Sequence, residues 1–141
     1  MSRIDLANYR INKAKEMIVE SEDNLLQKHY ALSVNRSYYA MFTSARALLA
    51  MKEVDSSKHS GVIALFNQHI IKPGFFPKEF SKFLSKAKNL RENADYGDFV
   101  EITKKDAQVQ LEYAKQFVKE VDLSLKKMIE SELPRPEGRG I

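Results

Sequence analysis

Residues 31 to 49 carry apolar or small side chains around most of the circumference of the helix that their spacing predicts. One series recurs at intervals of three and four, as the core-facing side of a helix does: Ala31, Val34, Tyr38, Met41, Ala45 and Leu48. A second series has the same spacing and only small members: Ser33, Ser37, Ala40, Ser44 and Ala47. A helix that is apolar on nearly every side is usually surrounded by protein. We therefore predict a central helix, from about Tyr30 to Lys52, around which the other segments pack.

Four other segments show helical periodicity. The predicted helices run from Arg3 to Leu26, from His59 to Ile71, from near Pro77 to a break at residues 93–100, and from Thr103 to about Leu133. No segment alternates between apolar and polar residues as a half-buried strand does. The predicted fold class is therefore all-α, an antiparallel up-and-down bundle of four long helices plus one short helix.

The expected core draws on the apolar stripes of these helices. Its predicted members are Ile11, Val34, Met41, Phe42, Phe80, Phe83, Leu90, Leu111 and Val118. Residues 1–133 should form the bundle, and residues 134–141, which contain two prolines and two glycines, a mobile tail.

Composition places the chain among ordinary globular proteins. It has 141 residues, which fits one domain, and it contains no cysteine, which excludes disulfides and thiolate metal sites. It shows neither a signal peptide nor a membrane span, so we expect a soluble, cytoplasmic protein. The net charge of +4 permits contact with nucleic acid without requiring it. The row Lys78, Lys82 and Lys86 is interpreted as a solvated helix face rather than a phosphate-binding stripe.

Few residues carry the patterns of known catalytic or cofactor sites. The three histidines, His29, His59 and His69, have no metal-binding spacing, and phosphate-binding glycine loops and nucleophile elbows are absent. We expect neither a metal nor a cofactor. From its spacing alone, His59 is interpreted as a capping or exposed residue at a helix start.

The stretch from Leu90 to Phe99 is the remaining candidate. Arg91 lies at the edge of the predicted core stripe, and Asn93, Asp95 and Tyr96 crowd the same helix end. A guanidinium there either pairs with a carboxylate to close the helix terminus or projects into a groove and binds phosphate in bidentate fashion. The residues favour neither reading over the other.

Three motifs, in order, resemble those of HEPN domains from bacteria and archaea, over about residues 5 to 130. They are Asn35-Arg36-Ser37-Tyr38-Tyr39-Ala40-Met41-Phe42, Lys58-His59-Ser60-Gly61-Val62-Ile63, and Leu90-Arg91 followed by Ala94-Asp95-Tyr96-Gly97-Asp98-Phe99-Val100. The resemblance is to the small stand-alone branch associated with minimal nucleotidyltransferases. It implies a component of a toxin–antitoxin-type pair that binds RNA or nucleotide.

Catalytic HEPN proteins are metal-independent endoribonucleases that use an arginine followed, after four to six residues, by a histidine. Arg91 matches the arginine, but the histidine window falls on Tyr96, Gly97 and Asp98. The resemblance therefore implies weak or absent cleavage, with Arg91 and Tyr96 as the candidate catalytic residues. Tyr96 is also a candidate acceptor of a nucleotide from the partner enzyme.

The expected ligand site combines residues from all three motifs. Its members are Arg91, Asn93, Asp95, Tyr96, Asn35, Arg36, Tyr39 and His59, gathered in one groove. Two alternatives stay open: an active ribonuclease that uses Arg91 with an atypical partner residue, and a non-catalytic helical domain that positions another enzyme's substrate.

The resemblance also implies a homodimer. The small-residue series on the central helix would let two helix backbones approach closely, and a two-fold helix pair is one use of it. The same series could instead receive the first or last helix of its own chain.

Overall fold

The fold was analysed in a computed structural model, which describes residues 2–96 and 101–132 and, for Ala94 and Tyr96, the backbone alone. Its elements are α1 (Arg3–Leu26), α2 (Tyr30–Met51), α3 (His59–Phe66), a π-helical segment (Asn67–Ile71), a 3₁₀ turn (Lys78–Phe80), α4 (Ser81–Tyr96) and α5 (Lys104–Glu132). The described residues contain no strand, so the predicted all-α class is confirmed.

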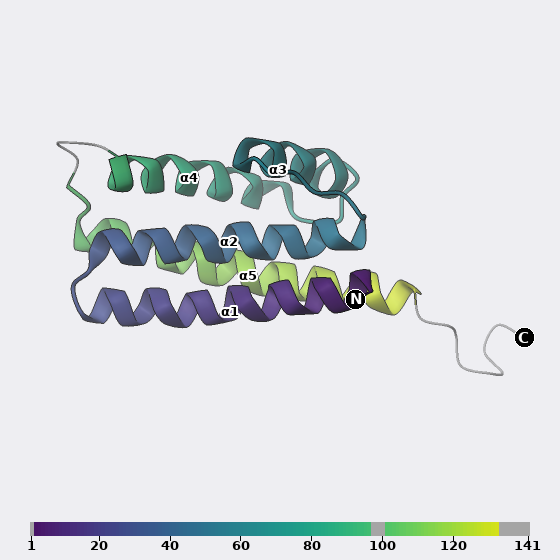
Figure 1. The fold of residues 1–141 in the computed structure, drawn as a ribbon, viewed down its shortest axis with the longest axis horizontal. Coiled ribbons are helices and arrows are strands. Elements are labelled where there is room, and N and C mark those ends of the chain that lie inside the picture. The colour runs from purple at the N-terminus through teal and green to yellow at the C-terminus, as the bar shows by residue number, and fades with distance from the viewer. Residues whose placement is uncertain (1, 97–100, 133–141) are drawn as a thin grey trace, which may run out of the picture.

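Helix α2 occupies the centre of the bundle, as its sequence predicts. In Figure 1 it lies between α1 on one side and the layer of α3 and α4 on the other, and it packs against α1, α4 and α5. Fourteen of its residues are buried, from Ser33 to Met51. A helix enclosed in this way has room for few charged side chains, and Arg36 and Arg46 are the only ones in α2.

The small residues of α2 pack within the chain. Ser33 and Ser37 are fully buried, and both bond to Ser21 of α1: the Ser21 and Ser33 hydroxyls are 2.9 Å apart, and those of Ser21 and Ser37 are 2.8 Å apart. Ala40, Ser44 and Ala47 are also fully buried within the single chain. The alternative in which this series receives the protein's own first helix is therefore the correct one, and its use as a dimer interface is wrong.

Most of the predicted core is confirmed. Ile11, Val34, Met41, Phe42, Leu111 and Val118 are buried. Phe80 and Phe83 pack against the core but remain partly exposed, and Leu90 is also only partly buried. These three lie on α4 and the turn before it, where the outer layer covers α2 without being covered itself.

Two helix ends differ from the sequence prediction. The short third helix is α-helical only to Phe66 and continues as a π-helical turn to Ile71. Helix α4 continues to Tyr96, into the break predicted at residues 93–100, whose last four residues lie outside the described part of the chain. Asp95 accepts a hydrogen bond from Arg91 one turn earlier, and a contact of this spacing stabilises a helix.

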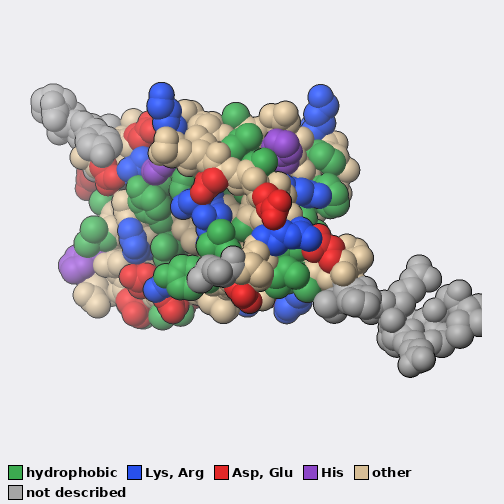
Figure 2. All heavy atoms as spheres, turned by 45° about the vertical axis from the view of Figure 1, so that its right-hand side comes forward, with side chains coloured by type: hydrophobic (Ala, Val, Ile, Leu, Met, Phe, Trp, Pro, Cys, Tyr) green, Lys and Arg blue, Asp and Glu red, His purple; other side chains and the backbone are tan. Residues whose placement is uncertain are grey.

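On the face drawn in Figure 2, positive side chains (blue) and negative side chains (red) are interspersed, and neither sign dominates the surface. Lys78, Lys82 and Lys86 are all exposed, in agreement with a solvated helix face. Within the described ranges 2–96 and 101–132, no helix is long and apolar enough to cross a membrane.

Candidate functional site

Aromatic rings on α2 form one wall of the candidate site. The ring centroids of Tyr38 and Tyr39 are 5.0 Å apart, and those of Tyr38 and Phe42 are 5.7 Å apart. Tyr38 is fully buried and Phe42 nearly so, whereas Tyr39 is partly exposed. Because residues four apart stand one above the other on a helix, Tyr38 and Phe42 present one continuous surface to α3 and α4.

Arg91 of α4 lies across both tyrosine rings. Its guanidinium carbon is 5.1 Å from the Tyr38 centroid and 5.6 Å from the Tyr39 centroid, distances typical of cation–π contacts. The residue is only 8% exposed, and Nη1 donates to Asp95 at 3.3 Å. Its Nε is buried and finds no hydrogen-bond partner among the described residues. Leaving a buried donor unpaired costs about 1–3 kcal/mol, so such a group requires an explanation.

His59 of α3 reaches the same rings from a third element. Its Nδ1 lies 2.9 Å from the Tyr38 hydroxyl, and its ring centroid lies 4.5 Å from that of Phe42. The centroid is also 5.8 Å from those of Tyr38 and Tyr39. The interpretation of His59 as a capping or solvent-exposed residue is therefore wrong, because the imidazole is built into the aromatic cluster.

The loop before α3 fixes the position of His59. The Ser56 hydroxyl accepts a hydrogen bond from the backbone N–H of Lys58 at 3.2 Å. A Cβ atom on Gly61 would overlap the Ser56 side chain, so a glycine is needed for this close approach. The loop is thereby folded against the first turn of α3, where His59 is the first residue.

Burial and positive charge determine the protonation of the cluster. Burial lowers the pKa of His59, and the charges of Arg91 and Lys88 lower it further. Burial also raises the pKa of the Tyr38 phenol far above its ordinary value of about 10. Near neutral pH the site therefore combines an uncharged imidazole, an uncharged phenol and a guanidinium cation.

Arg36 of α2 also contacts Tyr39. Its guanidinium carbon is 5.4 Å from the Tyr39 centroid, and its Nε and Nη2 both donate to the side-chain oxygen of Asn35, at 3.1 and 2.8 Å. Tyr39 thus has guanidinium groups from two helices near its ring. The amide of Asn35 restricts the orientation of one of them.

Comparison with known proteins identifies the family of the chain. Residues 7–127 match the family model of the HEPN domain, which spans most of the chain. The chain belongs to the HEPN domain family. The family assignment predicted from the three motifs is therefore confirmed.

Several relatives of this HEPN domain have descriptive names. A Methanocaldococcus jannaschii protein named "Putative toxin MJ0142" is 37% identical over 98 residues, which cover 70% of this chain and 67% of the relative. A second protein of that organism, "Putative toxin MJ0605", is 32% identical over 88% of this chain and 98% of its own length. A "UPF0332 protein" of Thermotoga maritima is 33% identical over 83% of this chain and 89% of its own length.

The structure brings most of the predicted site residues of the HEPN domain together, although not all of them. Arg91, Tyr39 and His59 share the aromatic cluster, with Asn35 and Arg36 beside it and Asp95 bonded to Arg91. Asn93 is exposed. Tyr96 ends α4, but its side chain lies outside the described residues. Tyr38 and Phe42 are the site residues that the sequence interpretation assigned to the core alone.

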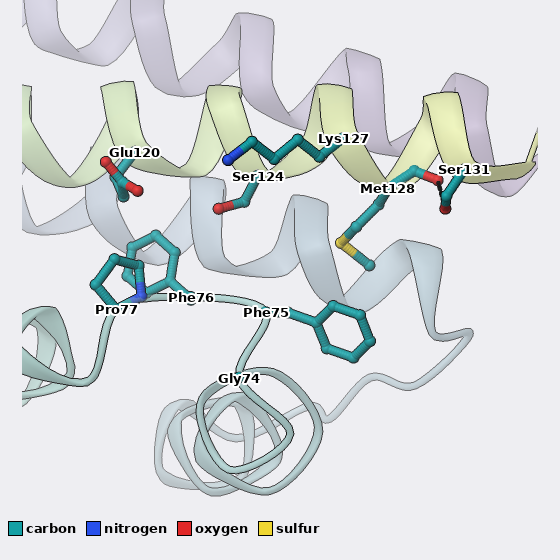
Figure 3. Close-up of a pocket in the computed structure, with 9 residues that line it drawn as sticks. All are labelled: Gly74, Phe75, Phe76, Pro77, Glu120, Ser124, Lys127, Met128 and Ser131. Carbon is teal, nitrogen blue, oxygen red and sulfur yellow. Dashed lines mark hydrogen bonds between the residues drawn. The ribbon is translucent and has the colours of Figure 1, made fainter.

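The main hollows of the described chain lie elsewhere, so the predicted groove around Arg91 does not appear as one of them. The hollow drawn in Figure 3, of about 500 Å³, lies between the segment Gly74–Pro77 and the second half of α5. A smaller hollow is lined by α3 and α4, with Ser60, Ile63, Ser85, Lys88 and Asn89 around it. Arg91 itself is only 8% exposed, so it is deeply set in the candidate site.

Metal ligands do not gather in the described part of the chain, where no three His, Asp or Glu side chains are close enough to hold an ion.

Proposed function

We propose that the surface around Arg91 binds the phosphate of RNA or of a nucleotide, and that the protein acts as the HEPN component of a toxin–antitoxin-type pair. The observation that supports binding most directly is the guanidinium of Arg91, which uses only Nη1 for hydrogen bonding within the described structure, to Asp95 at 3.3 Å. A phosphate oxygen would satisfy the remaining donors of this guanidinium with charge-assisted hydrogen bonds. The names of the two Methanocaldococcus jannaschii relatives support the toxin assignment.

The proposed protein partner is a minimal nucleotidyltransferase. This part of the proposal rests on the resemblance to the stand-alone HEPN branch. Tyr96, at the end of α4, is the proposed acceptor hydroxyl for a nucleotide that the partner transfers. A mass increase on the peptide that contains Tyr96, after incubation with such an enzyme and a nucleoside triphosphate, would support this assignment. An unmodified peptide would argue against it.

The family resemblance also supports a homodimer, although the small series of α2 is not its interface. The described structure exposes other large apolar side chains near the turn between α1 and α2, among them Leu26 and Leu32. A monomer mass in light scattering at micromolar concentration would contradict the dimer.

Cleavage is proposed to be weak or absent because Tyr96 occupies the window of the motif histidine, and a phenol with a pKa near 10 is a poor proton shuttle at neutral pH. One observation favours the alternative of an active ribonuclease: His59 lies against the same tyrosine rings as Arg91. The third possibility, a helical domain that positions another enzyme's substrate, requires only the binding step.

Binding is best tested with a fluorescently labelled single-stranded RNA and three proteins. Arg91→Ala should weaken binding by about 10- to 150-fold, the equivalent of about 1.5–3 kcal/mol for hydrogen bonds to a charged group. Lys82→Ala is a matched control, since it removes one positive charge from an exposed position of the same helix. Binding by the wild type should also weaken as salt is added.

The outcome separates a specific site from general charge attraction. Circular dichroism must first show that both variants keep their helices. Equal losses for Arg91→Ala and Lys82→Ala would indicate nonspecific attraction, and unchanged binding by Arg91→Ala would remove this residue from the site.

A further inference from the structure

The hollow between the segment Gly74–Pro77 and the second half of α5 has one apolar wall and one polar wall (Figure 3). Its volume of about 500 Å³ lies within the range of small-molecule sites, about 300–1,000 Å³. Phe75, Phe76 and Met128 supply most of the apolar surface, and the polar groups all come from α5: Glu120, Ser124, Lys127 and Ser131. A site of this composition suits a ligand with an apolar body and a few polar groups.

The fold itself holds the apolar wall in place. The chain turns after the π-helical segment at Gly74, whose φ of +89° is rarely adopted by a residue with a side chain. The backbone N–H of Phe75 then donates to the carbonyl of Ile70 at 2.9 Å. The Phe75 side chain is 41% exposed, yet Lys52 Nζ lies 3.8 Å from the centroid of its ring. An exposed ring that is already held in one position can receive a ligand without first being ordered.

Ser124 lies in the opposite wall, and its hydroxyl has no partner in the described chain. The residue is only 8% exposed, and Figure 3 shows the hydroxyl directed from α5 into the hollow, between Glu120 and Met128. Two other helical serines, Ser44 and Ser131, donate to the carbonyl three residues earlier, at 2.9 and 2.8 Å. Ser124 makes no such bond among residues 2–96 and 101–132. Its hydroxyl is therefore left for a molecule in the hollow.

Glu120 gives the hollow its charge preference. Asp122 of the same helix pairs with Lys15 at 3.0 Å, whereas Glu120 is partly buried and forms no ion pair or hydrogen bond within the described ranges. Lys127 lies at the rim of the hollow but is exposed, so solvent weakens its attraction for an anion. Solvent screens a partly buried carboxylate less than an exposed ammonium, so the hollow favours a cation.

We propose that this hollow binds an organic amine with an aromatic or apolar body. In this arrangement the ammonium group pairs with Glu120, and the apolar body lies against Phe75 and Met128. Ser124 stands between the two ends and bonds to a polar group of the ligand. Glu120 and Met128 are a little over two turns apart on α5, about 12 Å along the axis, so a bicyclic ring with a short amine arm is of suitable size. No lining residue belongs to the surface around Arg91, so the inference is independent of the proposed function.

The test is an NMR titration of the isotope-labelled full chain with two probes of equal ring and arm length. Tryptamine carries an ammonium group, and indole-3-propionate carries a carboxylate in the same place. Tryptamine should shift the amide signals of Gly74, Phe75 and the second half of α5, and it should saturate in the millimolar range expected of so small a ligand. Indole-3-propionate should bind at least about five-fold more weakly, because its charge has the sign of Glu120.

Three variants locate the contacts. Glu120→Gln keeps the size of the side chain and should weaken tryptamine binding by about 3- to 10-fold. Ser124→Ala should weaken it by about 2- to 10-fold, while stability in urea stays unchanged because no described hydrogen bond is lost. Glu130→Gln is the matched control, since it removes a carboxylate from an exposed position of the same helix and should leave binding unchanged.

Four results would overturn the inference: absence of saturation, shifts confined to other parts of the chain, equal affinity for the two probes, or unchanged tryptamine binding by Glu120→Gln. The same protein samples are tested for RNA binding. Tryptamine binding at this hollow without any RNA binding would support the inference and remove the proposed function. The reverse pattern would overturn the inference alone.

Discussion

Replacement of Arg91 by methionine separates a functional arginine from a structural one. The sequence leaves two readings of this residue open, a carboxylate-paired group that closes a helix end and a phosphate ligand. In the structure both features are present, since Arg91 pairs with Asp95 and also keeps a buried Nε without a described partner. The two readings differ in what the side chain contributes to folding, and that contribution can be worked out from its contacts.

The stabilising and destabilising contributions of Arg91 nearly cancel. Its contacts with the rings of Tyr38 and Tyr39 contribute about 0.5–1 kcal/mol each. The pair with Asp95 adds about 0.3–0.5 kcal/mol, as expected for an i,i+4 pair whose carboxylate is partly exposed. Against these stands a cost of about 1–3 kcal/mol for the unpaired buried donor. Methionine has a similar length, packs against aromatic rings and carries no donor. We therefore expect Arg91→Met to change the free energy of unfolding by less than about 1 kcal/mol.

Urea denaturation followed by circular dichroism measures this difference, and the same variant is assayed for RNA binding. Near-normal stability with binding weakened at least about ten-fold is the expected result. Asp95→Asn is the companion variant, and it should cost no more than about 0.5 kcal/mol because it removes only the ion pair. If Arg91→Met loses more than about 2 kcal/mol, the arginine is chiefly a structural group and the contact analysis is wrong.

Two further predictions concern the bundle itself. Ser21→Ala should lower the free energy of unfolding by about 1–3 kcal/mol, measured by urea denaturation, because Ser33 and Ser37 lose a buried hydrogen-bond partner; a loss below about 0.3 kcal/mol would contradict the serine cluster. The second prediction concerns the pH dependence of Asp55. Partial burial raises the pKa of its carboxyl, but hydrogen bonds from Arg46 and the Ser56 amide outweigh burial and lower the pKa overall. The stabilisation by Asp55 is therefore present above about pH 4 and is lost as the pH falls through the lowered pKa. The stability difference between the wild type and Asp55→Asn should therefore shrink on acidification, and a difference independent of pH between 2 and 7 would refute this assignment.

Periodicity was sufficient for most of the fold because the helices are long and each has one clear apolar stripe. The central helix, α1 and α5 follow directly from intervals of three and four. The small series of α2 shows the limit of this reasoning. It predicts that another backbone comes close, but it contains no information on which helix that is. The answer depends on Ser21, whose hydroxyl lies across from the series only after α1 and α2 have folded back on each other.

The candidate site was predicted less completely than the fold, for a related reason. Arg91, Tyr39, Arg36 and His59 were all found through their motifs. What the sequence did not show is that His59 packs into the aromatic cluster, because α2, α3 and α4, which form it, are distant from one another in the sequence. Its spacing to other histidines carried no signal. The consecutive aromatic residues Tyr38 and Tyr39 did carry a signal. A phenol buried at the centre of a bundle requires a hydrogen-bond partner, and a histidine can be that partner.

Tyr38 links the stability of the core to the geometry of the site. Its ring is fully buried, so the bundle fixes its position tightly, and its hydroxyl must find a partner to avoid the cost of an unpaired buried group. His59 supplies that partner, and Arg91 lies over the same ring. The need to satisfy one phenol in the core therefore holds an imidazole and a guanidinium in a fixed relation at the surface. A preorganised pair of this kind costs no ordering when a ligand arrives, which is the physical advantage of building a site on rigid helices.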